Sequence, residues 1–159
     1  MTICFLGLGS NLAHPQRQLR RAVKSIGNLP KTHILSSSGL YASEPCGFGF
    51  QPHYQNMVVC IKTHLSPNDV MKFCVEIEKK HKKIWKKKWG PRTLDIDLLL
   101  YGDKVIRQKN LIIPHPFLAA RDFVLQPLFE LAPNLVLPNG KPIFDYLTKA
   151  RKFIKDCKN

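Results

Sequence analysis

Two carboxylates stand two residues apart at the start of an apolar run. Asp95 and Asp97 belong to the segment WGPRTLDIDLLLYG, residues 89–102. On a strand, side chains at positions i and i+2 point to the same side, with Cα atoms roughly 6.5 Å apart. Two like charges beside an apolar strand repel each other, so either one carboxylate takes a proton or a cation lies between them. Magnesium suits such a pair, because it commonly uses one or two carboxylates together with substrate phosphates.

Two plainer interpretations of the pair stay open. Arg92 could neutralise both carboxylates, or Asp95 could cap a turn, since a D-x-D pattern is short and common. His115, within a P-H-P motif, is typical of a turn. Its place in the chain before Arg121 also makes it a candidate phosphate contact.

The densest positive charge lies just upstream, in EKKHKKIWKKKWGPR, residues 78–92. Such a run is usually a solvated helix end, and a nucleic-acid patch is the next interpretation. Trp85 and Trp89 could stack on the bases of a single strand, or cover a nucleotide or another flat ring beside a polyphosphate. No P-loop motif occurs, and Gly7-x-Gly9 lacks the rest of a dinucleotide fingerprint, so we interpret it as a strand-to-turn device.

Composition bounds the class of protein. The chain has 159 residues, 44% hydrophobic content and a formal net charge of +14, which predicts one folded domain with a surface that attracts anions. The five cysteines show no zinc or C-x-x-C spacing, which favours buried, reduced thiols. The N-terminus does not read as a signal peptide, and no apolar stretch reaches membrane-spanning length, so we expect a cytoplasmic protein without a membrane partner.

Hydrophobic spacing predicts the elements that must position these residues. Strands are expected at 3–9, 33–42, 54–63 and 96–101, a hairpin return at 103–113, and helices after Pro15, after the Ser66 N-cap, over 116–131 with an interruption near Pro127, and near 142–151. The order β-α-β-β-α-β predicts an α+β sandwich of ferredoxin-like type, with a mostly antiparallel sheet and helices packed on one face. A doubly wound parallel fold is disfavoured, because residues 33–63 supply two strands with no helix between them.

Several motifs in this order resemble one enzyme family. They are GSNL near the start, Y-x-S-E-P-x-G, Y-x-N, WGPRTLDIDLLLYG and PHP-x4-R-x-F-V-L-x-P-L. The chain is similar to 6-hydroxymethyl-7,8-dihydropterin pyrophosphokinases of folate biosynthesis over nearly its whole length, which implies one domain over 1–159 with the α+β fold. The resemblance implies transfer of the diphosphate of ATP to the pterin hydroxymethyl group, giving AMP, with two Mg²⁺ ions, by a monomer that binds no nucleic acid.

The resemblance also implies roles for individual residues. Asp95 and Asp97 would bind the Mg²⁺ ions and, with Arg92, form the catalytic set. The residues implied in pterin binding are Ser43, Glu44, Cys46, Tyr54, Asn56, Trp89 and Phe123, with Tyr54 and Phe123 stacking on the ring faces and Asn56 reading the ring edge. Those implied in ATP binding are Glu78, Lys83, Arg92, Leu98, His115 and Arg121. Apart from the resemblance, we expect segments 43–53 and 82–92 to act as lids over the site.

The chain departs from the family pattern in two places. Lysines occupy the stretch after Glu78 where the family commonly carries G-R-x-R, and Pro116 stands where an aromatic is often found. A lysine is a point charge and not a planar fork, so phosphate binding can differ there. The alternative function is a small basic domain that binds RNA or single-stranded DNA through residues 78–92 and has no need of the Asp pair.

Overall fold

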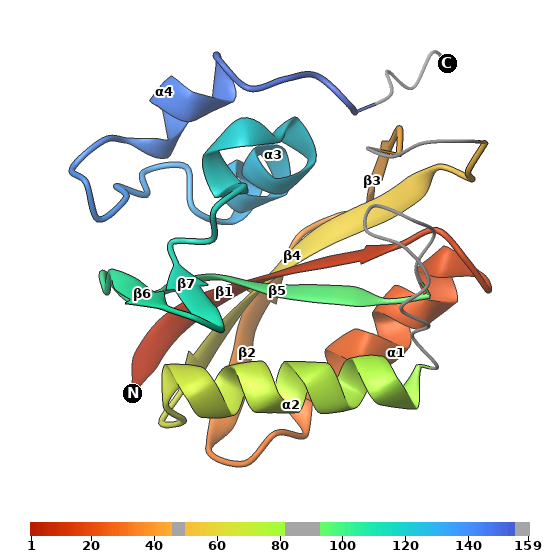
Figure 1. Ribbon diagram of the computed structural model, residues 1–159, viewed down its shortest axis with the longest axis horizontal. Helices are drawn as coiled ribbons and strands as arrows, with labels where there is room; N and C mark the ends of the chain where they lie inside the picture. Colours follow the sequence, from red (N-terminus) through yellow and green to blue (C-terminus); the bar gives the residue numbers. More distant parts are fainter. Residues whose placement is uncertain (46–49, 82–92, 155–159) are drawn as a thin grey trace.

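The computed structural model describes residues 1–45, 50–81 and 93–154 (Figure 1). The elements are, in chain order, β1 (Thr2–Ser10), α1 (Pro15–Gly27), β2 (Thr32–Ser37), β3 (Tyr41–Ser43), β4 (Tyr54–Thr63), α2 (Pro67–Lys80), β5 (Asp95–Tyr101), β6 (Ile106–Gln108), β7 (Leu111–Ile113), the 3-10 turn η1 (Leu118–Ala120), α3 (Asp122–Leu131) and α4 (Ile143–Leu147).

One five-stranded sheet organises the described part of the chain. Its order is β2-β4-β1-β5, with β3 also pairing with β4, and every pairing is antiparallel. A separate two-stranded sheet joins β6 to β7. The predicted α+β, ferredoxin-like sandwich is therefore confirmed.

Helices cover both faces of the sheet, not one face as predicted (Figure 1). α1 and α2 pack on one face over a core that includes Leu6, Ile61 and Leu98. α3 packs on the opposite face over a second core that includes Val58 and Leu99, and α4 packs against α3. The strands carry apolar residues on both sides because both faces are buried, which accounts for the continuous LLLY run that ends β5.

Local signals correctly located the first two helices. α1 begins at Pro15 and ends at Gly27, as predicted. α2 begins at Pro67 behind Ser66, whose Oγ accepts a hydrogen bond from the Asp69 backbone N–H at 3.1 Å. That bond satisfies one of the helix-terminal N–H groups that lack an intrahelical partner.

The strand predicted over 33–42 is two strands. β2 ends at Ser37 and β3 begins at Tyr41. Between them, the Oγ of buried Ser38 accepts the Val58 backbone N–H at 2.9 Å and donates to the Gly39 carbonyl at 2.8 Å. The Ser38 hydroxyl thus takes the place of a backbone carbonyl as the partner of Val58 in β4. The predicted strand 33–42 is interrupted at this point.

The C-terminal helices also differ from prediction. Residues 116–131 form η1 and then α3, because Arg121 between them is extended, with φ −127° and ψ 122°. The break is at Arg121 and not at Pro127, which is buried inside α3. α4 ends at Leu147, well short of the predicted residue 151.

Among the described residues, no helix is both long enough and apolar enough to cross a membrane.

Candidate active site

Strand β5 brings Asp95 and Asp97 onto one face, as the i, i+2 spacing predicted. Asp97 pairs with Gly7 of β1, and Asp95 pairs with Gly9. Further along, Phe5 pairs with Leu100 and Leu6 with Leu98, which leaves Leu99 as an extra residue in β5. The β-bulge falls directly after the acidic pair, a position at which bulges commonly re-aim side chains beside a site.

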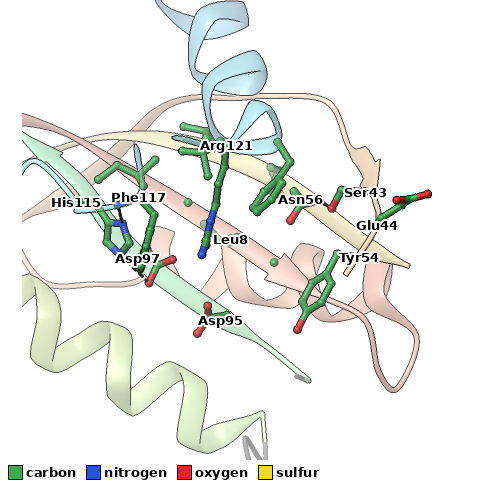
Figure 2. Close-up of a pocket in the computed structure, with 17 residues that line it drawn as sticks. Leu8, Ser43, Glu44, Tyr54, Asn56, Asp95, Asp97, His115, Phe117 and Arg121 are labelled. Atoms are coloured by element: carbon green, nitrogen blue, oxygen red, sulfur yellow. Dashed lines mark hydrogen bonds and ion pairs between the residues drawn. The ribbon is translucent and has the colours of Figure 1, made fainter. Parts of the chain in front are cut away.

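The two carboxylates line a cavity of about 130 Å³ on the α3 side of the sheet (Figure 2). Its lining residues are Gly7, Leu8, Gly9, Ser43, Glu44, Tyr54, Asn56, Met57, Val58, Asp95, Asp97, Leu99, His115, Phe117, Arg121, Phe123 and Val124. The cavity therefore combines acidic, basic and aromatic side chains from β4, β5, the segment 115–121, α3 and the residue after β3, next to Gly7, Leu8 and Gly9 of β1.

The floor of the cavity depends on two glycines that lie within β1. The interpretation of Gly7-x-Gly9 as a strand-to-turn device was wrong, since β1 continues to Ser10. A Cβ on Gly9 would lie 3.3 Å from Asn56 Oδ1 and 3.6 Å from Tyr54 Cδ1. Gly9 thus leaves room for these two side chains to approach the strand.

His115 and Asp97 face each other across one end of the cavity, with His115 Nε2 3.6 Å from Asp97 Oδ1 (Figure 2). The Nδ1 atom of His115 accepts the Phe117 backbone N–H at 3.2 Å, which places the proton of a neutral ring on Nε2, toward Asp97. Burial lowers the pKa of His115 and the charge of Arg121 lowers it further, while Asp95 opposes them. The structure therefore favours the neutral ring.

Arg121 reaches into the same cavity from the start of α3 (Figure 2). Its Cζ atom lies 4.3 Å from the centre of the Phe117 ring and 5.6 Å from that of Phe123. Aromatic faces attract a guanidinium and orient its plane. A planar cation is thereby held close to the two carboxylates, in a position suited to an anionic ligand.

Asn56 lies at the other end of the cavity and is 5% exposed. Its Nδ2 donates to the Tyr41 carbonyl at 3.0 Å and to the Ser43 Oγ at 2.7 Å. These two bonds fix the amide so that its Oδ1, an acceptor, lies over Gly9. Tyr54, on the same strand, lines this end as well.

Most of the predicted site residues that the structure describes meet in this cavity. They are Ser43, Glu44, Tyr54, Asn56, Asp95, Asp97, His115, Arg121 and Phe123. The predicted residues Cys46, Lys83, Trp89 and Arg92 lie outside the described residues, as do 46–49 of the first predicted lid and the whole of the second.

Two predicted ATP contacts do not line the cavity. Leu98 is 2% exposed and its side chain packs in the core beneath α1 and α2. Any contact that it makes with ATP would come from its backbone. Glu78 is 5% exposed, and its Oε1 accepts the Ile96 backbone N–H at 2.8 Å, between the two aspartates. Glu78 therefore holds the β5 backbone at the acidic pair.

Sequence reasoning missed part of the cavity wall. The residues not predicted are Gly7, Leu8, Gly9, Met57, Val58, Leu99, Phe117 and Val124. Strand alternation alone could have placed Leu99 beside Asp95 and Asp97. Phe117 gave a weaker signal, as an aromatic one position after Pro116.

The two aspartates suit a hard cation whose other ligands come from a bound phosphate and from water. Among the described residues, no group of three or more His, Cys, Asp or Glu side chains could hold a metal by itself. Two carboxylates on one strand face match the smaller set that Mg²⁺ uses when phosphate oxygens and water complete its shell. The residues present therefore fit Mg²⁺ bound together with a polyphosphate.

The sheet order and the cavity together define an α+β sandwich protein with one cavity that brings together two carboxylates, a guanidinium and aromatic rings. Residues 5–133 match the sequence model of the 7,8-dihydro-6-hydroxymethylpterin-pyrophosphokinase (HPPK) family. The chain belongs to this family. It is an ATP-dependent diphosphotransferase of folate biosynthesis, which transfers the pyrophosphoryl group of ATP to hydroxymethyldihydropterin.

Curated relatives agree with this assignment. The chain is 43% identical over 143 residues to the 2-amino-4-hydroxy-6-hydroxymethyldihydropteridine pyrophosphokinase of Haemophilus influenzae, covering 90% of this chain and 89% of the relative. It is 40% identical to the protein of the same name from Pseudomonas aeruginosa, with 90% and 88% covered. The nucleic-acid-binding alternative is not supported.

Solved structures agree in fold. A crystal structure of wild-type Plasmodium falciparum HPPK-DHPS superposes with a TM-score of 0.72 at 15% identity, covering 94% of this chain. This chain spans 43% of that longer protein. At such an identity the match establishes the fold alone.

Proposed function

We propose that the cavity beneath α3 is the active site of this diphosphotransferase. The observation that carries the proposal is that one cavity holds Asp95, Asp97 and Arg121 together with Tyr54 and Asn56. The first three suit a metal-bound polyphosphate, and the last two suit a flat heteroaromatic ring with polar groups on its rim. Both substrates of the reaction would thus meet above β1.

The pterin would bind at the end near β3. Tyr54 and Phe123 would stack on its two faces, and Asn56 would accept a hydrogen bond from a ring-edge N–H through Oδ1. The bonds from Asn56 Nδ2 to Tyr41 and Ser43 support this role, because they leave the acceptor side of the amide toward Gly9. Ser43 and Glu44 would complete the rim, joined by Cys46 and Trp89 as the resemblance implies.

The phosphates of ATP would bind at the opposite end. Arg121 would contact them with its planar fork, and the Nε2–H of His115 would donate to a phosphate oxygen. The Leu98 backbone, Lys83 and Arg92 are further contacts proposed from the resemblance. Glu78 would act here indirectly, through its bond to Ile96 between the two carboxylates.

Asp95 and Asp97 would hold Mg²⁺, two ions as the resemblance implies. When bound, the ions neutralise phosphate charge and raise the acidity of the attacking hydroxyl. The side chains of this chain contribute by positioning, since phosphoryl transfer depends mainly on the alignment of reactants and on charge stabilisation. Arg121 would stabilise negative charge on the transferred group, and the stacked pterin would keep its hydroxymethyl oxygen in line with the β-phosphorus.

The test measures AMP formation from ATP and hydroxymethyldihydropterin with Mg²⁺. Asp97→Asn and Asp95→Asn should each lower kcat by about a hundredfold or more, as expected for loss of a charge that stabilises the transition state. Asp103→Asn, which removes an exposed carboxylate just beyond β5, is the matched control and should keep full activity. A folded Asp97→Asn variant with wild-type turnover would contradict the proposal.

A separate experiment tests whether Asp97 binds Mg²⁺. Binding of an ATP analogue, measured by calorimetry, should weaken on chelation of Mg²⁺ in the wild type and depend far less on Mg²⁺ in Asp97→Asn. Equal Mg²⁺ dependence in both proteins would remove the metal role of Asp97.

We also propose that residues 1–159 form one domain that acts as a monomer in the cytoplasm. The free thiols of Cys4, Cys60 and Cys74 are buried, and burial raises the pKa of Cys4 to about 12, which suits a reduced protein that meets ATP inside the cell. Light scattering of the purified chain would test the monomer, and cell fractionation the location.

A further inference from the structure

Asp122, the first residue of α3, makes its contacts away from its own helix. The residue is 4% exposed, and its side chain does not cap α3. Its Oδ1 and Oδ2 accept the Phe153 backbone N–H at 3.0 Å each, and Oδ2 also accepts the Ile154 backbone N–H at 3.0 Å. A buried carboxylate thus receives two backbone N–H groups from a segment about thirty residues later in the chain.

The segment that Asp122 holds, Arg151–Ile154, also joins β3. The Phe153 carbonyl accepts the Glu44 backbone N–H at 3.0 Å, and Ile154 forms an antiparallel bridge with Ser43. A parallel bridge joins Arg151 to Arg121. Figure 1 shows these last described residues running from α4 past α3 toward β3. The segment is therefore a strut between two elements that do not follow each other in sequence.

Phe153 and Ile154 contact residues that line the cavity on two elements. Ser43 and Glu44 belong to β3 and the residue after it, and Phe123 belongs to α3. The Phe153 ring packs edge-on against Phe123, with ring centres 5.7 Å apart and planes at 73°. The guanidinium of Arg151 lies over the Phe153 ring, with its Cζ 5.0 Å from the ring centre. Phe153 itself does not line the cavity.

We propose that Asp122 is a positioning residue for pterin binding. By holding residues 151–154, it keeps Phe123 at the distance from Ser43 and Glu44 that a flat ring requires. Asp122 touches neither substrate, and its effect passes through Phe153. The carboxylate pair and His115 have no part in this connection, and Arg121 meets the segment through the backbone bridge to Arg151, so changes to the side chains of Asp122 and Phe153 should affect the pterin end more than the phosphate end. The inference rests on the proposed function, because it takes this cavity as the pterin site.

The test separates pterin binding from ATP binding. Asp122→Ala removes the acceptor, Asp122→Asn keeps one oxygen but turns an NH₂ group toward a backbone donor, and Phe153→Leu keeps the backbone bonds while removing the ring contact with Phe123. The dissociation constant of the pterin should rise about tenfold in Asp122→Ala and Phe153→Leu, and less in Asp122→Asn, as expected when the residues that support a binding site are removed. The dissociation constant of an ATP analogue with Mg²⁺ should change less than twofold, or about 0.4 kcal/mol.

Two controls and one double variant complete the design. Glu130→Gln changes another carboxylate of α3, one that accepts hydrogen bonds from Gly39 and Tyr41 and makes none with residues 151–154. Asp145→Asn removes an exposed charge from α4. Both variants should keep wild-type pterin affinity. The double variant Asp122→Ala/Phe153→Leu should bind the pterin as weakly as either single variant, because both changes act through one contact.

Each outcome decides the proposal. Unchanged pterin affinity in Phe153→Leu, equal losses for ATP and pterin, or additive effects in the double variant would each overturn it. If Asp122→Ala does not fold, Phe153→Leu and Asp122→Asn decide in its place. Wild-type AMP formation that is lost in Asp97→Asn would uphold the proposed function whatever Asp122 does, whereas a wild type that binds no pterin would overturn both.

Discussion

His115 and Asp97 share a fixed orientation: the Phe117 backbone N–H bonds to Nδ1 of the imidazole, and Nε2 on its other side lies 3.6 Å from Asp97 Oδ1. A neutral ring can meet both contacts at once, since it accepts at one nitrogen and donates at the other. Protonation would give Nδ1 a hydrogen that faces another donor. The local geometry and the lowered pKa of His115 thus agree.

This agreement predicts a pH dependence of stability. The folded-state pKa of His115 lies below its ordinary value of 6.5, so the unfolded chain binds more protons as the pH falls through that value. Stability should therefore decrease on acidification from neutral pH toward the folded-state pKa. Thermal unfolding followed from about pH 7.5 to pH 5 should show a flatter dependence in His115→Gln than in wild type.

His81 is the internal comparison for that experiment. Burial, followed by the charge of Arg21, lowers its pKa as well, and its Nδ1 bonds to Gln18 Oε1 at 2.6 Å. His81→Gln should flatten the same curve, and the two changes should add because the residues share no contact partner in the described structure. A wild-type Tm independent of pH over this range would contradict both assignments.

Gly9→Ala should impair the pterin end without unfolding the protein. The added Cβ would meet the polar Asn56 Oδ1 at 3.3 Å, and Asn56 has little freedom because Nδ2 is bound to two partners. We expect KM for the pterin to rise about tenfold, a loss of about 1.4 kcal/mol in binding, with little change in KM for ATP.

Gly7→Ala is the matched control for that change. The atoms nearest to its Cβ would be side-chain carbons of Leu99, also at 3.3 Å, at the acidic end of the floor. Steady-state kinetics with each substrate varied in turn should show no selective pterin defect. If both alanines raise KM for the pterin equally, the steric role of Gly9 toward Asn56 is wrong.

Glu78→Ala should destabilise β5 at the acidic pair. The change leaves the buried Ile96 N–H without its acceptor, and loss of a hydrogen bond to a charged group costs about 1.5–3 kcal/mol. Glu78→Gln keeps an acceptor oxygen and should lose about 1 kcal/mol or less. Urea denaturation gives the free energies of unfolding, and equal losses in the two variants would argue against the bond to Ile96 as the cause.

Phe117→Leu should weaken phosphate binding modestly. The Phe117 ring lies under the Arg121 guanidinium, and a cation–π contact at an exposed site contributes about 0.5–1 kcal/mol. KM for ATP should rise about two- to fivefold, which that energy implies. Phe144→Leu, a change at another exposed aromatic, should leave KM for ATP unchanged.

Local patterns were sufficient for the part of the fold where one signal dominates. The Ser66-Pro67 start of α2 and the apolar run of β5 were predictable because capping and strand periodicity act over a few residues. The i, i+2 spacing likewise placed Asp95 and Asp97 on one face. The second helical layer was not predictable in this way, because which face α3 covers depends on packing against the whole sheet.

The errors also have identifiable causes. Pro127 was expected to interrupt a helix, yet α3 continues through it because burial between the sheet and α4 outweighs the lost backbone bond. The last helix ends at Leu147, short of the predicted boundary, and residues 151–154 form bonds to Asp122 and to Glu44 beside β3. Nothing local to Asp122 indicates that its acceptor role is directed to the far end of the chain.

The contacts of residues 151–154 have a consequence for the order of folding during synthesis. The strands of the main sheet, β1 to β5, all lie before residue 102 and can pair before residues 151–154 leave the ribosome. The connection between Asp122 and β3 requires Phe153 and Ile154, which emerge after every helix and strand described. A nascent chain can thus possess its central sheet while the cavity still lacks the connection between α3 and β3 at the end proposed for the pterin.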